Sequence, residues 1–132
     1  MSLDALLTVR NKLISSSDLT ALVPASQIKV GWQKTIDSFP CIIINQAAGN
    51  DVGYLGYATS PSGNKVRREQ VTVQIDIYSR KSRQNVFEIA DEIVPLMISL
   101  GSSKDSDVDD FNDDLSVYRK IQTYTFFKFH DD

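Results

Sequence analysis

The chain has 132 residues, of which 42% are apolar and 23% are charged. This balance is typical of one soluble globular domain over residues 1–132, and it excludes a disordered chain. A net charge of −3 lacks the basic field of a stand-alone nucleic-acid-binding domain. The longest uninterrupted apolar run, 41–44, is too short to span a membrane, and the N-terminus lacks the pattern of a secretory signal.

Two short helical segments are predicted at the N-terminus. Leucines from Leu3 to Leu13 recur at helical spacing, with Asp4 in the first turn, and predict a helix over 3–15. Ser17 or Asp18 is expected to cap a further turn that runs through Val23 and that Pro24 ends.

Two strands should follow. Ile28, Val30 and Trp32 alternate with polar residues, as in a half-buried strand. The apolar run Cys41–Ile44, preceded by Pro40, is typical of a strand that is covered on both faces.

The segment 46–65 has a different character from the rest of the chain. It holds four of the six glycines and shows neither a helical nor a strand period. We therefore expect a long flexible loop or a flexible hairpin arm, and loops of this length are usually functional or disordered.

The second half of the chain starts with the clearest patterns. Val71, Val73, Ile75 and Ile77 alternate with polar residues and predict an amphipathic strand. Ser82 is placed to cap a helix with one apolar stripe that ends near Gly101. Pro95 lies inside this pattern, so we expect a kink or a break near Val94.

An acidic segment, 104–114, separates that helix from the end of the chain. Its aspartates echo the start of a calcium loop, but Asp110 stands where the sharp turn needs glycine and Ser116 stands where a bidentate glutamate is needed. We expect a solvated acidic turn. Apolar residues between Leu115 and Phe129 then predict a long final strand or a pair of strands.

This order of elements favours an α+β fold over a doubly wound one. We expect a single, mostly antiparallel sheet of about four strands, with two main helices packed on one face. We also expect a long flexible loop beside this sheet.

Catalytic chemistry finds little support in the sequence. The one histidine, His130, lies near the C-terminus, and Cys41 lies in an apolar run where a thiol behaves as a small hydrophobe. The glycines of 49–56 match neither a phosphate loop nor a dinucleotide fingerprint. We therefore expect no catalytic residue, no metal site and no cofactor, although a small ligand-binding or enzymatic α+β domain is kept as an alternative.

Charge is segregated along the chain, and two groups of side chains are candidates for contacts with other subunits. The basic group comprises Lys65, Arg67, Arg68, Arg80, Lys81 and Arg83. The acidic group comprises Asp105, Asp107, Asp109, Asp110, Asp113 and Asp114. Such patches usually form solvated faces, but in a ring of identical subunits opposite patches can meet head to tail.

The pattern resembles the small tail completion or tail terminator proteins of long-tailed bacteriophages and prophages. The resemblance rests on the leucine-rich first helix, the segment 28–32, Phe39-Pro40 before an apolar strand, the glycine-rich segment and the strand Val71–Ser79. The helix from Gln84 to Met97 and the aromatic C-terminal strand from Tyr124 to Phe129 complete it.

The resemblance implies structural work rather than enzymatic activity. Proteins of this family form a ring, commonly a hexamer, on the last ring of the tail tube, stop its growth and offer a docking surface to the neck. The expected partners are other copies of the chain, the tail tube protein and the head–neck connector proteins, in a virion assembled in the host cytoplasm.

Within this resemblance, the segment 46–65 would become ordered against a neighbouring ring, with Tyr54, Leu55 and Tyr57 as anchors. The acidic group, with Asp109, Asp110, Asp113 and Asp114 among its members, would repel the phosphates of DNA passing through the ring. A head-closure or neck connector protein of the same virion is the alternative of similar size.

Overall fold

The computed structural model describes residues 3–31, 33, 36, 38–59, 65–112 and 116–131. Its helices are α1 (Leu3–Ile14), α2 (Ser17–Leu22) and α3 (Arg83–Ser99), with a short 3-10 turn at Ala25–Gln27. Its strands are β1 (Ile28–Val30), β2 (Cys41–Thr59), β3 (Lys65–Ser79), β4 (Ser103–Asn112) and β5 (Val117–Asp131).

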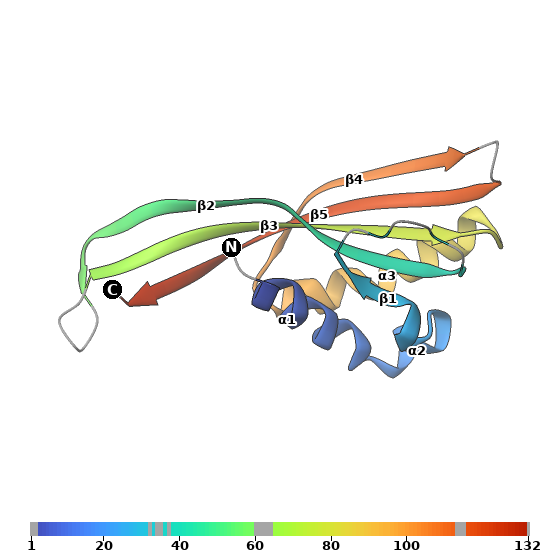
Figure 1. Ribbon diagram of the computed structural model, residues 1–132, viewed down its shortest axis with the longest axis horizontal. Coiled ribbons are helices and arrows are strands. Elements are labelled where there is room, and N and C mark those ends of the chain that lie inside the picture. Colours follow the sequence, from blue (N-terminus) through green and yellow to red (C-terminus); the bar gives the residue numbers. More distant parts are fainter. Residues whose placement is uncertain are drawn as a thin grey trace.

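The strands form one sheet in the order β1-β2-β3-β5-β4. β1 runs parallel to β2, and the other neighbouring pairs are antiparallel. All three helices lie against one face of the sheet (Figure 1). The predicted α+β class and the mostly antiparallel sheet are confirmed, with five strands in place of about four.

The hydrophobic core lies between this face and the helices. β3 contributes Val71, Val73, Ile75 and Ile77, all 0% exposed, and α3 packs Val86, Ile89, Ile93 and Met97 over them. The clean alternation of β3 therefore marks the face that the helices cover, as predicted. Cys41–Ile44 are all buried, so the strand expected to be covered on both faces is confirmed as well.

The helix boundaries follow local capping. The Ser82 hydroxyl accepts a hydrogen bond from the Asn85 N–H at 3.0 Å, so the predicted cap of α3 is confirmed. The cap of α2 is Ser16, whose hydroxyl accepts from the Leu19 N–H at 3.2 Å, rather than Ser17 or Asp18.

α3 continues through Pro95, so the break expected near Val94 is wrong. The proline is on the exposed side of the helix, and so is Asp91, the residue whose carbonyl loses its helical donor. Because water can reach that carbonyl, the helix tolerates the proline close to its C-terminal end.

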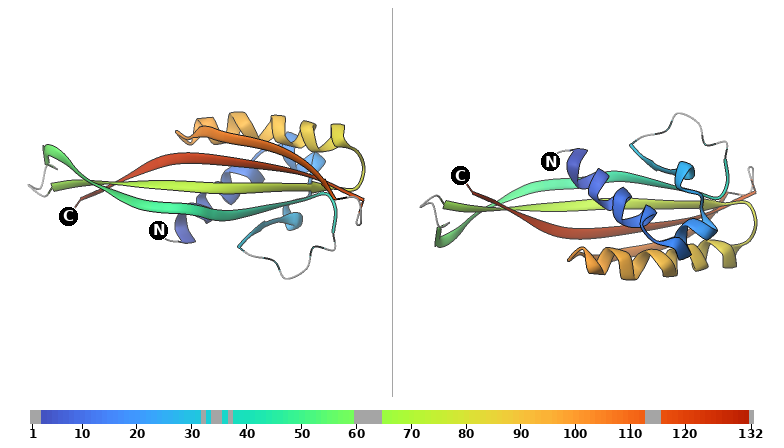
Figure 2. Two further views of the ribbon diagram at one scale, coloured as in Figure 1. Left: turned by 90° about the horizontal axis from the view of Figure 1, so that it is seen from above. Right: turned by 90° about the horizontal axis from the view of Figure 1, so that it is seen from below.

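The segment 46–65, expected as a flexible loop, is mostly strand. β2 extends to Thr59 and pairs with β3 through Gly49↔Val71, Asp51↔Glu69 and Thr59↔Lys65, with irregularities between these points. β5 pairs with the same stretch of β3 as far as Val66↔Asp131. This three-stranded part of the sheet, which we call the arm (46–59, 65–70 and 126–131), extends beyond the helices (Figures 1 and 2).

The structure of the arm explains why the sequence of 46–59 shows no strand period. Main-chain pairing with β3 makes it a strand, and most of it extends beyond the helices, so an alternating apolar side is not required along its length. The alternative of a hairpin arm, given alongside the loop, matches its pairing. Trp32 lies outside the described residues.

The face of the sheet opposite the helices carries a polar cluster around Asp76, a residue only 6% exposed. Its carboxylate accepts from the Arg119 guanidinium at 2.9 Å and from the Gln74 amide at 3.0 Å. Tyr78 lies beside this pair, and burial, together with the Asp76 charge, raises its pKa. Ion pairing across β3 and β5 therefore satisfies the buried carboxylate on this face.

The position of the core predicts which substitutions lower the stability of the fold. Ile75→Ala should destabilise the fold by about 2 to 5 kcal/mol, because it removes a fully buried side chain from the central strand. Val108→Ala, at a side chain that is 51% exposed on β4, is the matched control and should change stability by less than about 0.5 kcal/mol. Urea unfolding followed by circular dichroism measures both, and equal losses would contradict the assignment of the core.

Candidate interaction surface

The acidic segment forms the edge strand β4, so the expectation of a solvated acidic turn is wrong. β4 pairs with β5 from Ser103↔Thr125 to Asn112↔Val117 and is the last strand of the sheet. All its residues from Ser103 to Phe111 are exposed. Asp113 and Asp114 lie outside the described residues.

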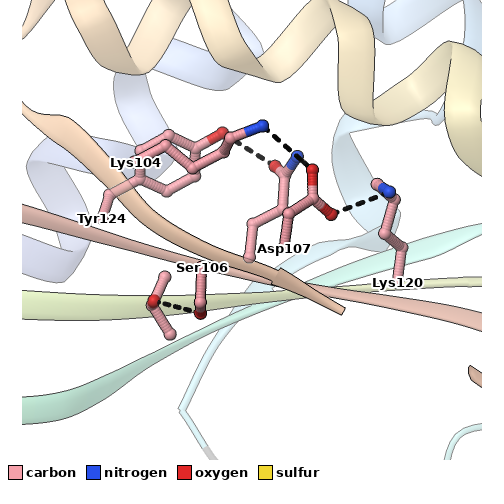
Figure 3. A network of polar contacts seen from close by, with 7 residues as sticks. Lys104, Ser106, Asp107, Lys120 and Tyr124 are labelled. Atoms are coloured by element: carbon pink, nitrogen blue, oxygen red, sulfur yellow. Dashed lines mark hydrogen bonds and ion pairs between the residues drawn. The ribbon is translucent and has the colours of Figure 1, made fainter. Parts of the chain in front are cut away.

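A polar network attaches β4 to the sheet (Figure 3). The Asp107 carboxylate forms ion pairs with Lys120 of β5 at 2.7 Å and with Lys104 of β4 at 3.0 Å. Gln122 donates to the same carboxylate at 3.4 Å and accepts a hydrogen bond from the Tyr124 hydroxyl at 2.8 Å. The network thus runs from an exposed strand edge to Tyr124, which is fully buried in the core.

Lys120 is the least exposed cation of this network. Its side chain is 8% exposed, and its ammonium group lies 4.1 Å from the centre of the Phe87 ring of α3. A buried ammonium needs such partners, since an unpaired charge in this position would be strongly destabilising. Nothing in the sequence identified Lys120, Gln122 or Phe87, because their meeting depends on the register of β4 on β5.

The groups around Asp107 also shift the pKa of its carboxyl group. Burial raises the pKa of Asp107, but hydrogen bonds from Lys120, Lys104 and Gln122 outweigh it and hold the pKa below its ordinary value. Desolvation also raises the pKa of the Tyr124 phenol, so this group stays neutral at ordinary pH.

Two of the predicted interaction residues meet inside one chain. Arg83, at the start of α3, forms an ion pair with Asp109 of β4. The opposite patches, which could meet head to tail in a ring, are therefore partly joined within one chain. Asp110 accepts a hydrogen bond from the backbone N–H of Phe111 at 2.8 Å.

The other predicted residues fall into two places. Arg80 and Lys81 are exposed after β3, and the Arg80 guanidinium lies 4.6 Å from the centre of the Phe39 ring. The remaining residues belong to the arm: Tyr54, Leu55 and Tyr57 to β2, and Lys65, Arg67 and Arg68 to β3. Their side chains lie outside the described part of the structure, and their backbone pairing places Arg67 opposite Tyr54.

Concave features near these residues are shallow. One depression of about 360 Å³ is lined by Arg83, Asp109, Asp110, Phe111 and Tyr118, and the Phe111 and Tyr118 rings lie 4.6 Å apart. Within the described residues, no group of His, Cys, Asp or Glu is arranged to hold a metal ion, and no helix is long and apolar enough to cross a membrane.

The lowered pKa of Asp107 predicts a pH dependence of stability. A carboxyl group whose pKa is lower in the folded state stabilises the fold above its unfolded pKa of about 4, and this contribution is lost as the pH falls through the folded value. Asp107→Asn should therefore be less stable than the wild type at neutral pH, and the difference should shrink below about pH 4. Urea unfolding at several pH values measures this difference.

Asp91→Asn is the control, because it removes an exposed carboxylate of α3 for which no ion pair occurs within the described residues. It should show a smaller pH-dependent difference than Asp107→Asn. A difference between wild type and Asp107→Asn that stays constant down to about pH 3 would contradict the role given to the network.

Comparison with known proteins gives the fold and the family of this chain. The described fold resembles a chain in the solved structure titled "Virion of native gene transfer agent (GTA) particle", with a TM-score of 0.62 and 9% sequence identity. The match covers 94% of this chain and 95% of that one, which shows a shared fold over nearly the whole length. A search of curated protein sequences finds no match.

A sequence match to a defined family runs from residue 8 to residue 119. It therefore includes the second half of α1, all of α2 and α3, the strands β1 to β4, and the first residues of β5. The description of that family, tail completion protein gp17, agrees with the resemblance seen in the sequence, and it gives the chain a structural, tail-associated role. The chain belongs to the tail completion protein gp17 family.

Proposed function

We propose that the chain forms a ring on the end of a phage tail tube, stops tube growth and provides the surface to which the head or neck docks. The family match over residues 8–119 carries this proposal. The likeness to a chain of a gene transfer agent virion, over nearly its whole length, supports it. We expect no enzymatic step and a ring of about six copies.

The division of the molecule into two parts suits such a role. The helices and the core strands form a packed body, and the arm extends beyond the helices (Figure 1). An arm of this kind can reach a neighbouring subunit or the last ring of the tube. Tyr54, Leu55 and Tyr57 are its proposed anchors, because aromatic and large apolar side chains contribute strongly to interfaces.

The negative charge of β4 is less available to repel the phosphates of passing DNA than the sequence suggested. Asp107 and Asp109 are each paired with a basic side chain of the same chain, which reduces their effect on a passing phosphate backbone. Asp110 of this strand accepts a hydrogen bond from a backbone N–H rather than from a cation. If the lumen is acidic, Asp110, with Asp113 and Asp114, is the better candidate.

The proposed function predicts the phenotype of a phage or prophage from which the gene has been removed. Particles made without the chain should contain tails of irregular length that are not joined to heads, and wild-type chain supplied from a plasmid should restore joined tails. Electron microscopy of the particles measures tail length and joining. Joined tails of normal length without the chain would overturn the proposal.

Variants of the arm refine this experiment. A chain with Tyr54→Ser, Leu55→Ser and Tyr57→Ser should fold but fail to restore joined tails, whereas Leu7→Ser, at an exposed position of α1, should restore them.

Pull-down against purified tail tube protein and purified portal or adaptor protein separates the two structural roles. Binding to the portal or adaptor alone would replace the terminator role by that of a neck connector.

A further inference from the structure

The sheet has two edges with unpaired main-chain groups, on opposite sides. β1 pairs with only three residues of β2, Ile42 to Ile44, and from Gln46 onward no described strand pairs with that side of β2. β4 occupies the other side of the sheet and pairs only with β5. An open edge of this kind is a template for pairing with another strand.

At Asp107 and Asp109 the exposure of β4 lies largely in the main chain. Asp107 and Asp109 are exposed residues, although their side chains are only 24% and 26% exposed, because these side chains bend onto Lys120 and Arg83. The side chains that would shield a strand edge are thus used to attach β4 to the sheet. Val108, 51% exposed, and Phe111, 43% exposed, leave apolar surface along the same strand.

Hydrogen bonds identify the main-chain groups that point outward. The Ile44 carbonyl accepts from the Gly31 N–H at 2.9 Å, so Ile44 faces away from β3, and its partner Ile75 faces β5. Because facing alternates along a strand, Val73, Val71 and Glu69 also face β5. Their partners on β2, which are Gln46, Gly49 and Asp51, therefore face outward.

The same reasoning applies to β4. Ile75, Ile77 and Ser79 face their β5 partners, which are Gln122, Lys120 and Tyr118. The β4 residues opposite these three, Asp107, Asp109 and Phe111, must then face outward. The Phe111 N–H confirms this direction, since it donates to the Asp110 carboxylate and not to β5.

Charge decides which edges can meet. β4 carries four aspartates and one lysine, so two copies of β4 side by side would gather like charges across the pair, which is destabilising. The β2 edge from Asn45 to Thr59 carries one charged residue, Asp51, and the next strand of the arm carries Lys65, Arg67 and Arg68. The acidic edge therefore suits the β2 edge better than it suits itself.

We infer that the outward edge of β4 in one copy pairs with the outward edge of β2, from Gln46 toward the arm, in a second copy. The two edges differ, so the contact is head to tail, and such contacts close into rings. This inference rests on the proposed ring and names the surface that joins its subunits. Asp110 must release the Phe111 N–H before another strand can pair there, which guards the edge in the free chain.

Proline variants test the inference, because proline removes an outward N–H without removing a bond to the inner neighbour. The β2-blocked variant carries Gln46→Pro and Asp51→Pro, and the β4-blocked variant carries Asp109→Pro. The matched controls carry alanine at the same positions. Light scattering over a concentration series measures the mass of each protein, and circular dichroism verifies folding.

Wild type and the alanine controls should form multimers as concentration rises, whereas each blocked variant alone should stay monomeric. An equimolar mixture of the two blocked variants should give a dimer of twice the chain mass, because one copy retains β4 and the other retains β2. Self-association of either blocked variant, or a mixture that stays monomeric, would overturn head-to-tail pairing. A wild type that is monomeric at every concentration would overturn it too.

Hydrogen exchange of the wild type gives a second measurement that needs no variant. The amides of Gln46, Gly49, Asp51, Asp107 and Asp109 should gain protection when the multimer forms, and unchanged exchange at these amides would overturn the inference. If the complemented phage has joined tails but the light-scattering and hydrogen-exchange results contradict edge pairing, only the edge pairing is overturned. The proposed function then stands.

Discussion

The architecture depends on the two-sidedness of β3. Its even alternation places Val71, Val73, Ile75 and Ile77 under the helices and places Gln74 and Asp76 on the opposite face. Because β3 lies in the centre of the sheet, it aligns both β2 and β5, and a slip by one residue would bury Asp76 against the helices. The ion pair between Asp76 and Arg119 fixes the same register from the polar face.

This dependence explains how much of the fold the sequence reveals. The sequence predicts β3 and α3, because their apolar residues repeat with the period of the face that packs in the core. It also predicts the Ser82 cap of α3. β4 and the outer part of β2 have no such period, since their partners are main-chain groups of the neighbouring strand. Tertiary pairing alone makes Ser103–Asn112 a strand, and composition alone suggested a turn.

The interaction surface shows a related limit. Charge segregation is visible in the sequence and drew attention to Arg83 and Asp109, which the structure does bring together. The sequence cannot show whether such patches meet within a chain or between chains, because that depends on the register of β4 on β5. For the same reason the sequence did not identify Lys120. Because its side chain is buried, the attachment of β4 depends on this cation more than on any other of the network.

The way in which β4 is attached bears on assembly. Asp107 and Asp109 point inward to Lys120 and Arg83, so the strand is held by ion pairs near the surface and presents the main chain of these two residues outward. Ion pairs of this kind stabilise a strand only modestly, and a further strand on the outer edge would exclude water from them and strengthen them. Pairing at the edge and attachment of β4 would then reinforce each other, so that a subunit with a neighbour on this edge holds its own sheet more firmly than a free one. A ring built in this way gains stability at each junction as it closes.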